Sequence, residues 1–176
     1  AHSMGMTVVA DGDVTIDGSR AFGSCGSHED TTASALSFRV NHTPPTTRVR
    51  QTDISILGTF SLIGAGSVSV AAASTMNLGG DFDNQSVRPE CFDWQSGALL
   101  LAGTSPQFFE VAARDVGPVA SLGGAEFAIG AVNVAAESSV TFRDAFDNDL
   151  AGQASCSEAL YVGTLTLRPN SNITLD

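Results

Sequence analysis

The feature of this sequence that most restricts its fold is a regular alternation of apolar and small polar residues. Apolar side chains recur at every second position, usually with Ser, Thr or Asn between them, at Ile54 and Ile56, Phe60 and Leu62, Val68 and Val70, Val132 and Val134, Leu165 and Leu167, and Ile173 and Leu175. A period of two places alternate side chains on opposite faces of a pleated strand. An amphipathic helix would need apolar residues three and four positions apart. The chain is therefore predicted to be all-β.

The spacing of these segments suggests how the strands are arranged. Candidate strands begin near Ile54, Phe60, Val68 and Thr75, with gaps filled by Gly, Asn, Asp and Ser. Three such strands give a period of about 21 residues, which is typical of repeat architectures. We predict a parallel β-helix (β-solenoid) with coils of this length. A β-sandwich is the alternative, because its strands also alternate, but it would pair neighbouring strands as antiparallel hairpins.

An internal repeat supports a solenoid. The segments 68–84 and 132–148 align without a gap, and both end in Phe-Asp-Asn. We interpret the offset between them as three coils. Cys91 and Cys156 follow the two segments and are predicted to occupy equivalent places. Three coils at strand spacing separate them by roughly 14 Å, beyond the limit of about 7 Å between Cα atoms for a disulfide.

The length favours a single domain. One solenoid is predicted over residues 1–176, a length that suits one hydrophobic core. Residues 1–5 are either a mature N-terminus or a remnant of cloning. Pro44 and Pro45 block regular structure, so residues 41–48 are predicted to form a loop.

The charge composition excludes several classes of partner. There are 19 acidic residues against 8 basic ones, all of them Arg, and the formal net charge is −11. Nucleic-acid binding needs clustered Lys and Arg, and so does attraction to anionic membranes. The sequence has no apolar run of about 18 residues, so no membrane insertion is predicted. Cations, neutral glycans and protein partners remain compatible with the acidic surface.

Two acidic turns are candidate metal sites. Asp81 and Asp83 lie in one of them, and Asp144, Asp147 and Asp149 lie in the other. Carboxylate oxygens are the ligands that Ca²⁺ prefers, although the spacing fits no EF-hand loop. The alternative is ordinary turn chemistry, since Asp and Asn bond to their own backbone. Calcium is therefore a candidate ligand, and no other cofactor is predicted.

Aromatic residues are the second candidate site. Alternation places Phe92 and Trp94 on one face of their segment, where they could stack on a sugar ring, although a buried core is the commoner place for such residues. No catalytic constellation is evident. Cys25 and His28 are near neighbours without an oxyanion feature. The chain is predicted not to be an enzyme, and a carbohydrate-active enzyme, which needs two positioned carboxylates, is the weakest alternative.

Three segments carry a resemblance to a known group of proteins. They are GDFDN at 80–84, FDWQSGALLLAGTSPQFFEVAARDVG at 92–117 and EALYVGTLTLRPNSNITL at 158–175. This text resembles the repeat and tail modules of large secreted surface proteins of planctomycete-type bacteria, which have no assigned catalytic residues. The resemblance implies an extracellular, β-helix-like module, and in those proteins the sequence usually continues further.

The function expected from these observations is structural. We expect an extracellular structural or adhesive protein of the cell surface or matrix. Because solenoid ends leave backbone groups unpaired, the ends either join head to tail into filaments or are capped by a natural continuation of the chain. The alternative is a glycan-binding module of a larger secreted protein.

Overall fold

The computed structural model describes residues 6–10, 14–18, 35–38, 52–64, 67–70, 74–122, 127–148 and 158–176. Apart from one 3-10 turn, η1 (Pro89–Cys91), the regular elements in these ranges are β-strands. The segments expected as an N-terminal remnant (1–5) and as a loop (41–48) lie outside the described residues. No helix among the described residues is long and apolar enough to cross a membrane.

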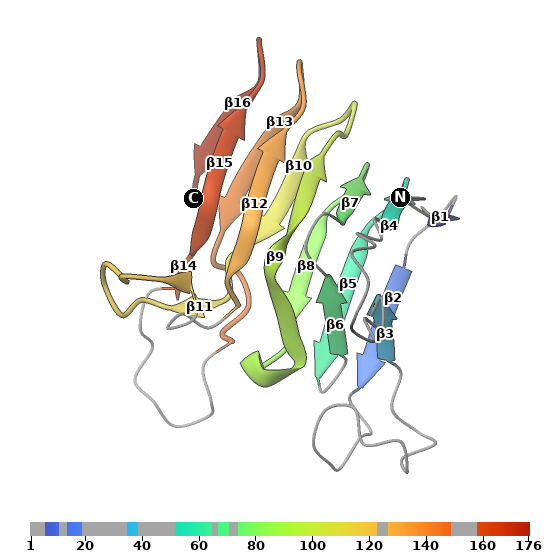
Figure 1. Cartoon of the computed structure of the whole chain (residues 1–176). Helices are drawn as coiled ribbons and strands as arrows, with labels where there is room; N and C mark the ends of the chain where they lie inside the picture. The colour runs from blue at the N-terminus through green and yellow to red at the C-terminus, as the bar shows by residue number, and fades with distance from the viewer. Residues whose placement is uncertain are drawn as a thin grey trace, which may run out of the picture.

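The first of two large sheets forms one side of the molecule (Figure 1). Its pairings are all parallel. Its main strands, in spatial order, are β1 (Met6–Ala10), β4 (Thr52–Ile56), β7 (Thr75–Leu78), β9 (Phe92–Leu101), β12 (Ile129–Val134) and β15 (Val162–Leu167). Two shorter strands, β3 (Ala35–Phe38) and β6 (Ser67–Val70), join the sheet through the first half of β9.

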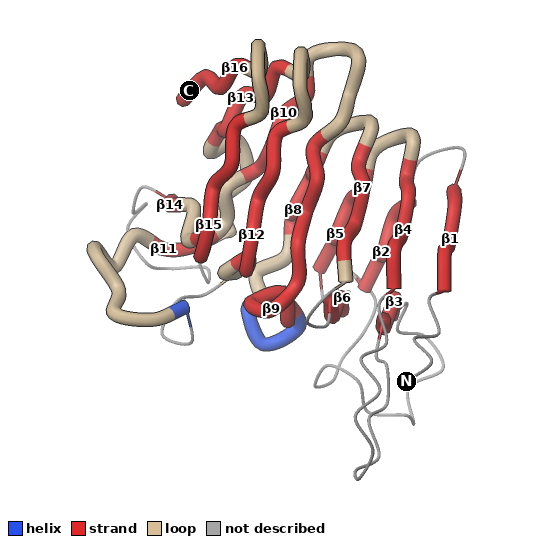
Figure 2. The backbone as a smooth tube through the Cα atoms, turned by 45° about the horizontal axis from the view of Figure 1, so that its top comes forward, coloured by secondary structure: helices blue, strands red, loops and turns tan. Residues whose placement is uncertain are grey.

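The second sheet lies behind the first and is also entirely parallel (Figure 1). Its order is β2 (Val14–Gly18), β5 (Phe60–Gly64), β8 (Phe82–Gln85), β10 (Gln107–Glu110), β13 (Ser139–Arg143) and β16 (Asn172–Leu175). The chain alternates between the two sheets and advances by one strand position in each turn, as the tube in Figure 2 shows. The predicted parallel β-helix is confirmed, and the alternative of a β-sandwich built from antiparallel hairpins is wrong.

Strand register gives the length of the coils from β4 onward; the first step, from Met6 in β1 to Thr52 in β4, is about twice the predicted length. In the first sheet, Asp53 pairs with Thr75 and Thr75 with Ala98, so these coils agree closely with the predicted length. The next two steps, from Ala98 to Ala131 and from Ala131 to Thr164, are equal to each other and about half as long again. The later coils are longer because they have additional residues between a strand of the second sheet and the next strand of the first sheet. These residues include the small antiparallel pair of β11 (Ala113–Arg114) and β14 (Glu158–Ala159).

The internal sequence repeat is not a structural repeat, and its interpretation as three coils is wrong. Val68 lies in β6 and pairs with Phe92, whereas Val132 lies in β12 and pairs with Leu99 and Leu165. The two aligned segments therefore occupy different places in their coils. Of the two cysteines used in that interpretation, Cys156 and the side chain of Cys91 lie outside the described residues, so the absence of a disulfide between them stays a prediction.

The alternating apolar residues fill the space between the sheets. Buried side chains from successive coils lie directly above one another, because parallel pairing keeps the same face inward. In the second sheet this produces a ladder of aromatic rings, with Phe60 stacked on Phe82 at 5.7 Å, Phe82 on Phe109 at 4.6 Å, and Phe109 next to Phe142 at 5.1 Å between ring centroids. The core is thus a set of columns that run along the solenoid.

A column of glycines allows the longer coils to approach closely. A Cβ on Gly130 would lie 2.7 Å from the carbonyl oxygens of Gln95 and Gly97, and one on Gly163 would lie 2.5 Å from the carbonyl oxygen of Gly130. Such distances leave no room for a side chain. The positions 97, 130 and 163 are therefore restricted to glycine by the coil above or below them.

The last coil exposes residues that continue the buried columns. Leu165 pairs with Val132, Leu167 with Val134, and Leu175 with Phe142, so all three occupy inward-facing positions. Yet their exposed fractions are 40%, 48% and 79%. They are exposed because no described strand covers β15 and β16 on their outer side.

Candidate metal centre

Three carboxylates converge at the edge of the second sheet. Glu110 is the last residue of β10, Asp144 follows β13, and Glu158 begins β14. One carboxylate oxygen from each lies within 4.8 Å of the other two. Among the described residues no other group of three or more His, Cys, Asp or Glu side chains converges in this way. Segments that are far apart in the sequence are thus brought together by the coil structure.

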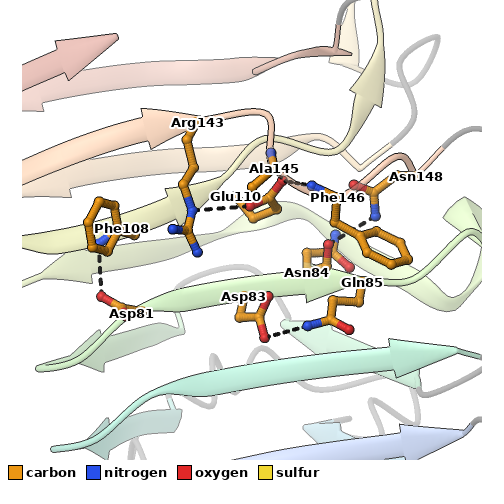
Figure 3. A network of polar contacts seen from close by, with 10 residues as sticks. All are labelled: Asp81, Asp83, Asn84, Gln85, Phe108, Glu110, Arg143, Ala145, Phe146 and Asn148. Atoms are coloured by element: carbon orange, nitrogen blue, oxygen red, sulfur yellow. Dashed lines mark hydrogen bonds and ion pairs between the residues drawn. The ribbon is translucent and has the colours of Figure 1, made fainter. Parts of the chain in front are cut away.

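Parallel register places Glu110 in this cluster. Glu110 pairs with Arg143 on the neighbouring strand, and the chain turns immediately after Arg143. In that turn the amides of Ala145 and Phe146 donate hydrogen bonds of 2.6 and 2.7 Å to Glu110 Oε1, as Figure 3 shows. Glu110 is buried, and two amide donors are what a buried carboxylate requires. It therefore anchors the turn that carries Asp144.

The antiparallel pair of β11 and β14 positions Glu158. Its neighbour across the ladder is Arg114. The Glu158 amide donates a hydrogen bond of 3.1 Å to Asp144 Oδ2, and Glu158 Oε1 accepts one of 2.5 Å from the amide of Asn148. The other carboxylate oxygen, Oε2, is buried and has no hydrogen-bond partner among the described residues.

Asn148 links this cluster to the preceding coils. Its side-chain amide nitrogen donates to the carbonyl oxygens of Asn84, at 2.9 Å, and Ser86, at 2.7 Å. These two bonds fix the orientation of the side-chain amide. Its oxygen, Oδ1, is then left buried and without a hydrogen-bond partner in the described part of the chain. In Figure 3 this oxygen is directed toward Phe146 and away from Asn84.

The cluster is strongly negative. The pKa of Glu158 is raised from 4.5 to about 7, chiefly because burial disfavours its charged form and also because Asp144, Glu110 and Asp147 repel it; the hydrogen bond from Asn148 acts in the opposite direction. Arg143 is the counter-charge, with its Nε 3.4 Å from Glu110 Oε2. This distance is that of an ion pair and is too long for a good hydrogen bond.

The structure separates the two acidic turns that the sequence suggested. Asp81 accepts a hydrogen bond of 2.8 Å from the amide of Phe108, and Asp83 accepts one of 2.9 Å from the side chain of Gln85. The alternative expected bonds to the backbone of each residue's own turn, but neither bond is of this kind: Phe108 lies in the next coil, and Asp83 lies within β8 and binds a side chain. Asp144 belongs to the three-carboxylate cluster, and Asp147 is close enough to affect the pKa of Glu158.

The remaining predicted ligand, Asp149, lies outside the described residues. Sequence reasoning missed Glu110 and Glu158, because neither lies in an acidic turn. The available signal was Glu110 itself, a charged residue at the end of an apolar strand segment.

The two aromatic residues predicted as a glycan platform lie in the core. Trp94 is fully buried and Phe92 nearly so. Trp94 lies edge-on to Phe60 and Phe82 and 5.6 Å from the Phe92 ring, so both side chains belong to the core columns. A buried ring has no free face for a sugar. The glycan-binding alternative therefore loses the residues on which it depended.

A hollow of about 470 Å³ lies over the first sheet near the glycine column. Its lining includes no carboxylate, imidazole or thiol, so this hollow offers no pair of groups for acid–base or nucleophilic chemistry. The lining residues are Ser74, Thr75, Gln95, Ser96, Gly97, Ala98, Gly130 and Ala131.

Comparisons with known proteins add no assignment: the chain matches no protein-family model, no curated protein sequence and no solved structure.

Proposed function

We propose that this chain is an extracellular structural or adhesive protein of the cell surface or matrix, whose solenoids join head to tail. The observation that supports the proposal is the exposed inward-facing row on the last coil, Leu165, Leu167 and Leu175. A further coil stacked on this row would bury these side chains as the coil before it buries Val132, Val134 and Phe142.

Unpaired strand edges support the same proposal. Strands β15 and β16 at one end, and β1 and β2 at the other, each pair with a described strand on one side only. Edge strands present free N–H and C=O groups, which readily pair with another chain. Because the two ends differ, a contact between them is heterologous, and such contacts extend into open filaments when they do not close.

The location outside the cell is supported by the resemblance of segments 80–84, 92–117 and 158–175 to modules of secreted surface proteins. The acidic composition without lysine disfavours nucleic acids and anionic membranes as partners. A filament with a net negative surface would also repel its neighbours laterally.

Sedimentation velocity tests the proposal. We expect the weight-average sedimentation coefficient to rise between about 1 μM and about 100 μM protein, the range in which micromolar contacts form. The double variant Leu165→Asp/Leu167→Asp should remain monomeric over that range, because it places charges on the face that joins the next copy. Circular dichroism of the variant is the check that it remains folded.

The matched control is Val116→Asp, which changes an exposed apolar residue outside the last coil. It should associate as the unaltered protein does. A monomer at every concentration, or equal loss of association in the control and the double variant, contradicts head-to-tail assembly.

A further inference from the structure

We propose that Glu110, Asp144 and Glu158 bind one calcium ion, with the side-chain oxygen of Asn148 as a fourth protein ligand. The carboxylate oxygens lie within 4.8 Å of one another. Two oxygens bound to the same Ca²⁺ at 2.3–2.6 Å are separated by at most about 5 Å. The three carboxylates therefore already have the spacing that one calcium ion requires.

The second observation is independent of the acidic cluster. Asn148 is only 4% exposed, and its Oδ1 has no hydrogen-bond partner among the described residues. A buried polar atom without a partner costs free energy, so it is normally paired with protein, water or an ion. Asn148 Oδ1 cannot exchange places with its amide nitrogen, because that nitrogen already donates to the carbonyl oxygens of Asn84 and Ser86.

Asn148 itself lies beside the carboxylates. The amide of Asn148 donates to Glu158 Oε1 at 2.5 Å, so the two residues are in direct contact. Glu158 Oε2 is itself buried without a partner among the described residues. A cation between these oxygens would satisfy both of them at once.

The charges around the site favour a cation. The site gathers Glu110, Asp144, Glu158 and the nearby Asp147. Two cations oppose these four acids: Arg143, which is paired with Glu110, and Arg114, the cross-strand neighbour of Glu158. Arg143 pairs with Glu110, and its guanidinium carbon also lies 4.4 Å above the Phe108 ring. Glu110 is thus the weakest ligand of the three, since its oxygens are shared with Arg143 and two amides.

The donor set selects the class of ion. All four proposed ligands are oxygen atoms, and the cluster includes no His or Cys. Oxygen donors suit Ca²⁺, Mg²⁺ and Mn²⁺. Calcium takes six to eight ligands in flexible geometry, whereas Mg²⁺ demands a near-ideal octahedron. An irregular set supplied by a strand end, a turn and a two-residue strand fits calcium better.

Isothermal titration of the chelator-treated full chain with CaCl₂ tests the site. We expect one calcium ion per chain. Glu158→Gln keeps an oxygen to accept the Asn148 amide, and Asp144→Asn keeps one for the Glu158 amide, so both variants should fold. Each should weaken calcium binding by about tenfold or more. Asp83→Asn, an equal charge change in the other acidic turn, should bind calcium as the unaltered protein does.

Thermal unfolding gives a second readout. Calcium in excess should raise the melting temperature of the unaltered protein and of Asp83→Asn, because a ligand of the native state stabilises it. The rise should be absent in Glu158→Gln. No calcium binding by the folded, unaltered chain overturns the proposal. Equal losses in Asp83→Asn and Glu158→Gln also overturn it.

Discussion

Gln107, at the start of β10, is a buried residue that uses both ends of its side-chain amide. Its nitrogen donates to the carbonyl oxygens of Leu78 and Gly80 in the coil below, and its oxygen accepts a hydrogen bond of 2.8 Å from the amide of Gly103. Gln107 therefore supplies hydrogen-bond partners to buried backbone groups at the edge where the chain crosses between the two sheets.

Replacing Gln107 with Leu should destabilise the protein. The change removes the hydrogen-bond partner of the Gly103 amide and of the Gly80 carbonyl, which costs about 2–4 kcal/mol, while the Leu78 carbonyl keeps its bond from the Ala102 amide. Gln95→Leu is the matched control, because Gln95 is exposed and should change stability by about 0.5 kcal/mol at most. Urea unfolding of the two variants measures the difference. Equal midpoints would show that the Gln107 bonds contribute nothing.

The raised pKa of Glu158 predicts how stability depends on pH when no calcium is present. Between pH 4.5 and about 7 the native state keeps a proton on Glu158 that the unfolded state has lost. The native state binds more protons, so the contribution of Glu158 to the free energy of unfolding decreases as pH rises through this window and is constant above it.

Chemical unfolding in chelator at several pH values tests this expectation against Glu158→Gln, which cannot titrate. The unaltered protein should lose stability relative to the variant between pH 4.5 and about 7. Identical pH profiles would mean that the Glu158 carboxyl has its ordinary pKa in the folded protein.

At the scale of the strand, β10 carries two adjacent phenylalanines, one buried and one exposed. Phe109 is buried in the aromatic ladder between Phe82 and Phe142, whereas Phe108 is on the outer face beneath Arg143. Phe109→Ala should cost about 3–5 kcal/mol through lost burial and a cavity. Phe108→Ala should cost about 1 kcal/mol or less, the value of an exposed cation–π contact. Thermal or urea unfolding compares the two, and similar losses would contradict the assigned inward face.

The positions of strands can be predicted from the sequence where the local alternation of apolar and polar residues determines them. The strands expected near Ile54, Phe60, Val68 and Thr75 are β4 to β7, because alternation specifies both the strand and its buried face. The same pattern does not specify coil length, which depends on how much chain leaves the solenoid between strands.

The longer coils had a sequence signal of their own. Segments starting at Trp94, Phe127 and Leu160 are equally spaced and align without gaps, and each has a glycine three positions later, at 97, 130 and 163. The match between 68–84 and 132–148 is richer in identical residues and conceals this period. Both segments alternate and then reach an acidic stretch, which explains the similar residues. That stretch lies in β8 in the first segment and in the turn after β13 in the second, so the two segments occupy different places in their coils.

The carboxylate cluster was only partly predictable. Asp144 lies in a conspicuous acidic turn, but Glu110 and Glu158 lie in other elements, one well before it and one after it in the sequence. Their convergence depends on the parallel register between β10 and β13 and on the antiparallel pair of β11 and β14. Neither pairing follows from alternation alone.

For the whole molecule, net charge should control assembly. Two copies that each carry a formal charge of −11 repel one another, whereas the proposed contact is apolar. Raising NaCl from about 20 mM to about 200 mM shortens the screening length by roughly threefold. We therefore expect head-to-tail association, measured by sedimentation in chelator, to strengthen with salt. Weakening would show that opposite charges hold the copies together.

The direction of the strands also has a mechanical consequence. Coils are joined to their neighbours by backbone hydrogen bonds that run along the solenoid axis, while the chain within each coil runs across it. Tension along the axis loads every interface between coils, and an outermost coil, which is held by a described strand on one side only, would open first. One of the longer coils, with about 33 residues, would release about 110 Å of extended chain when it opens. A fibre of such units would dissipate a pull stepwise and lengthen before it breaks.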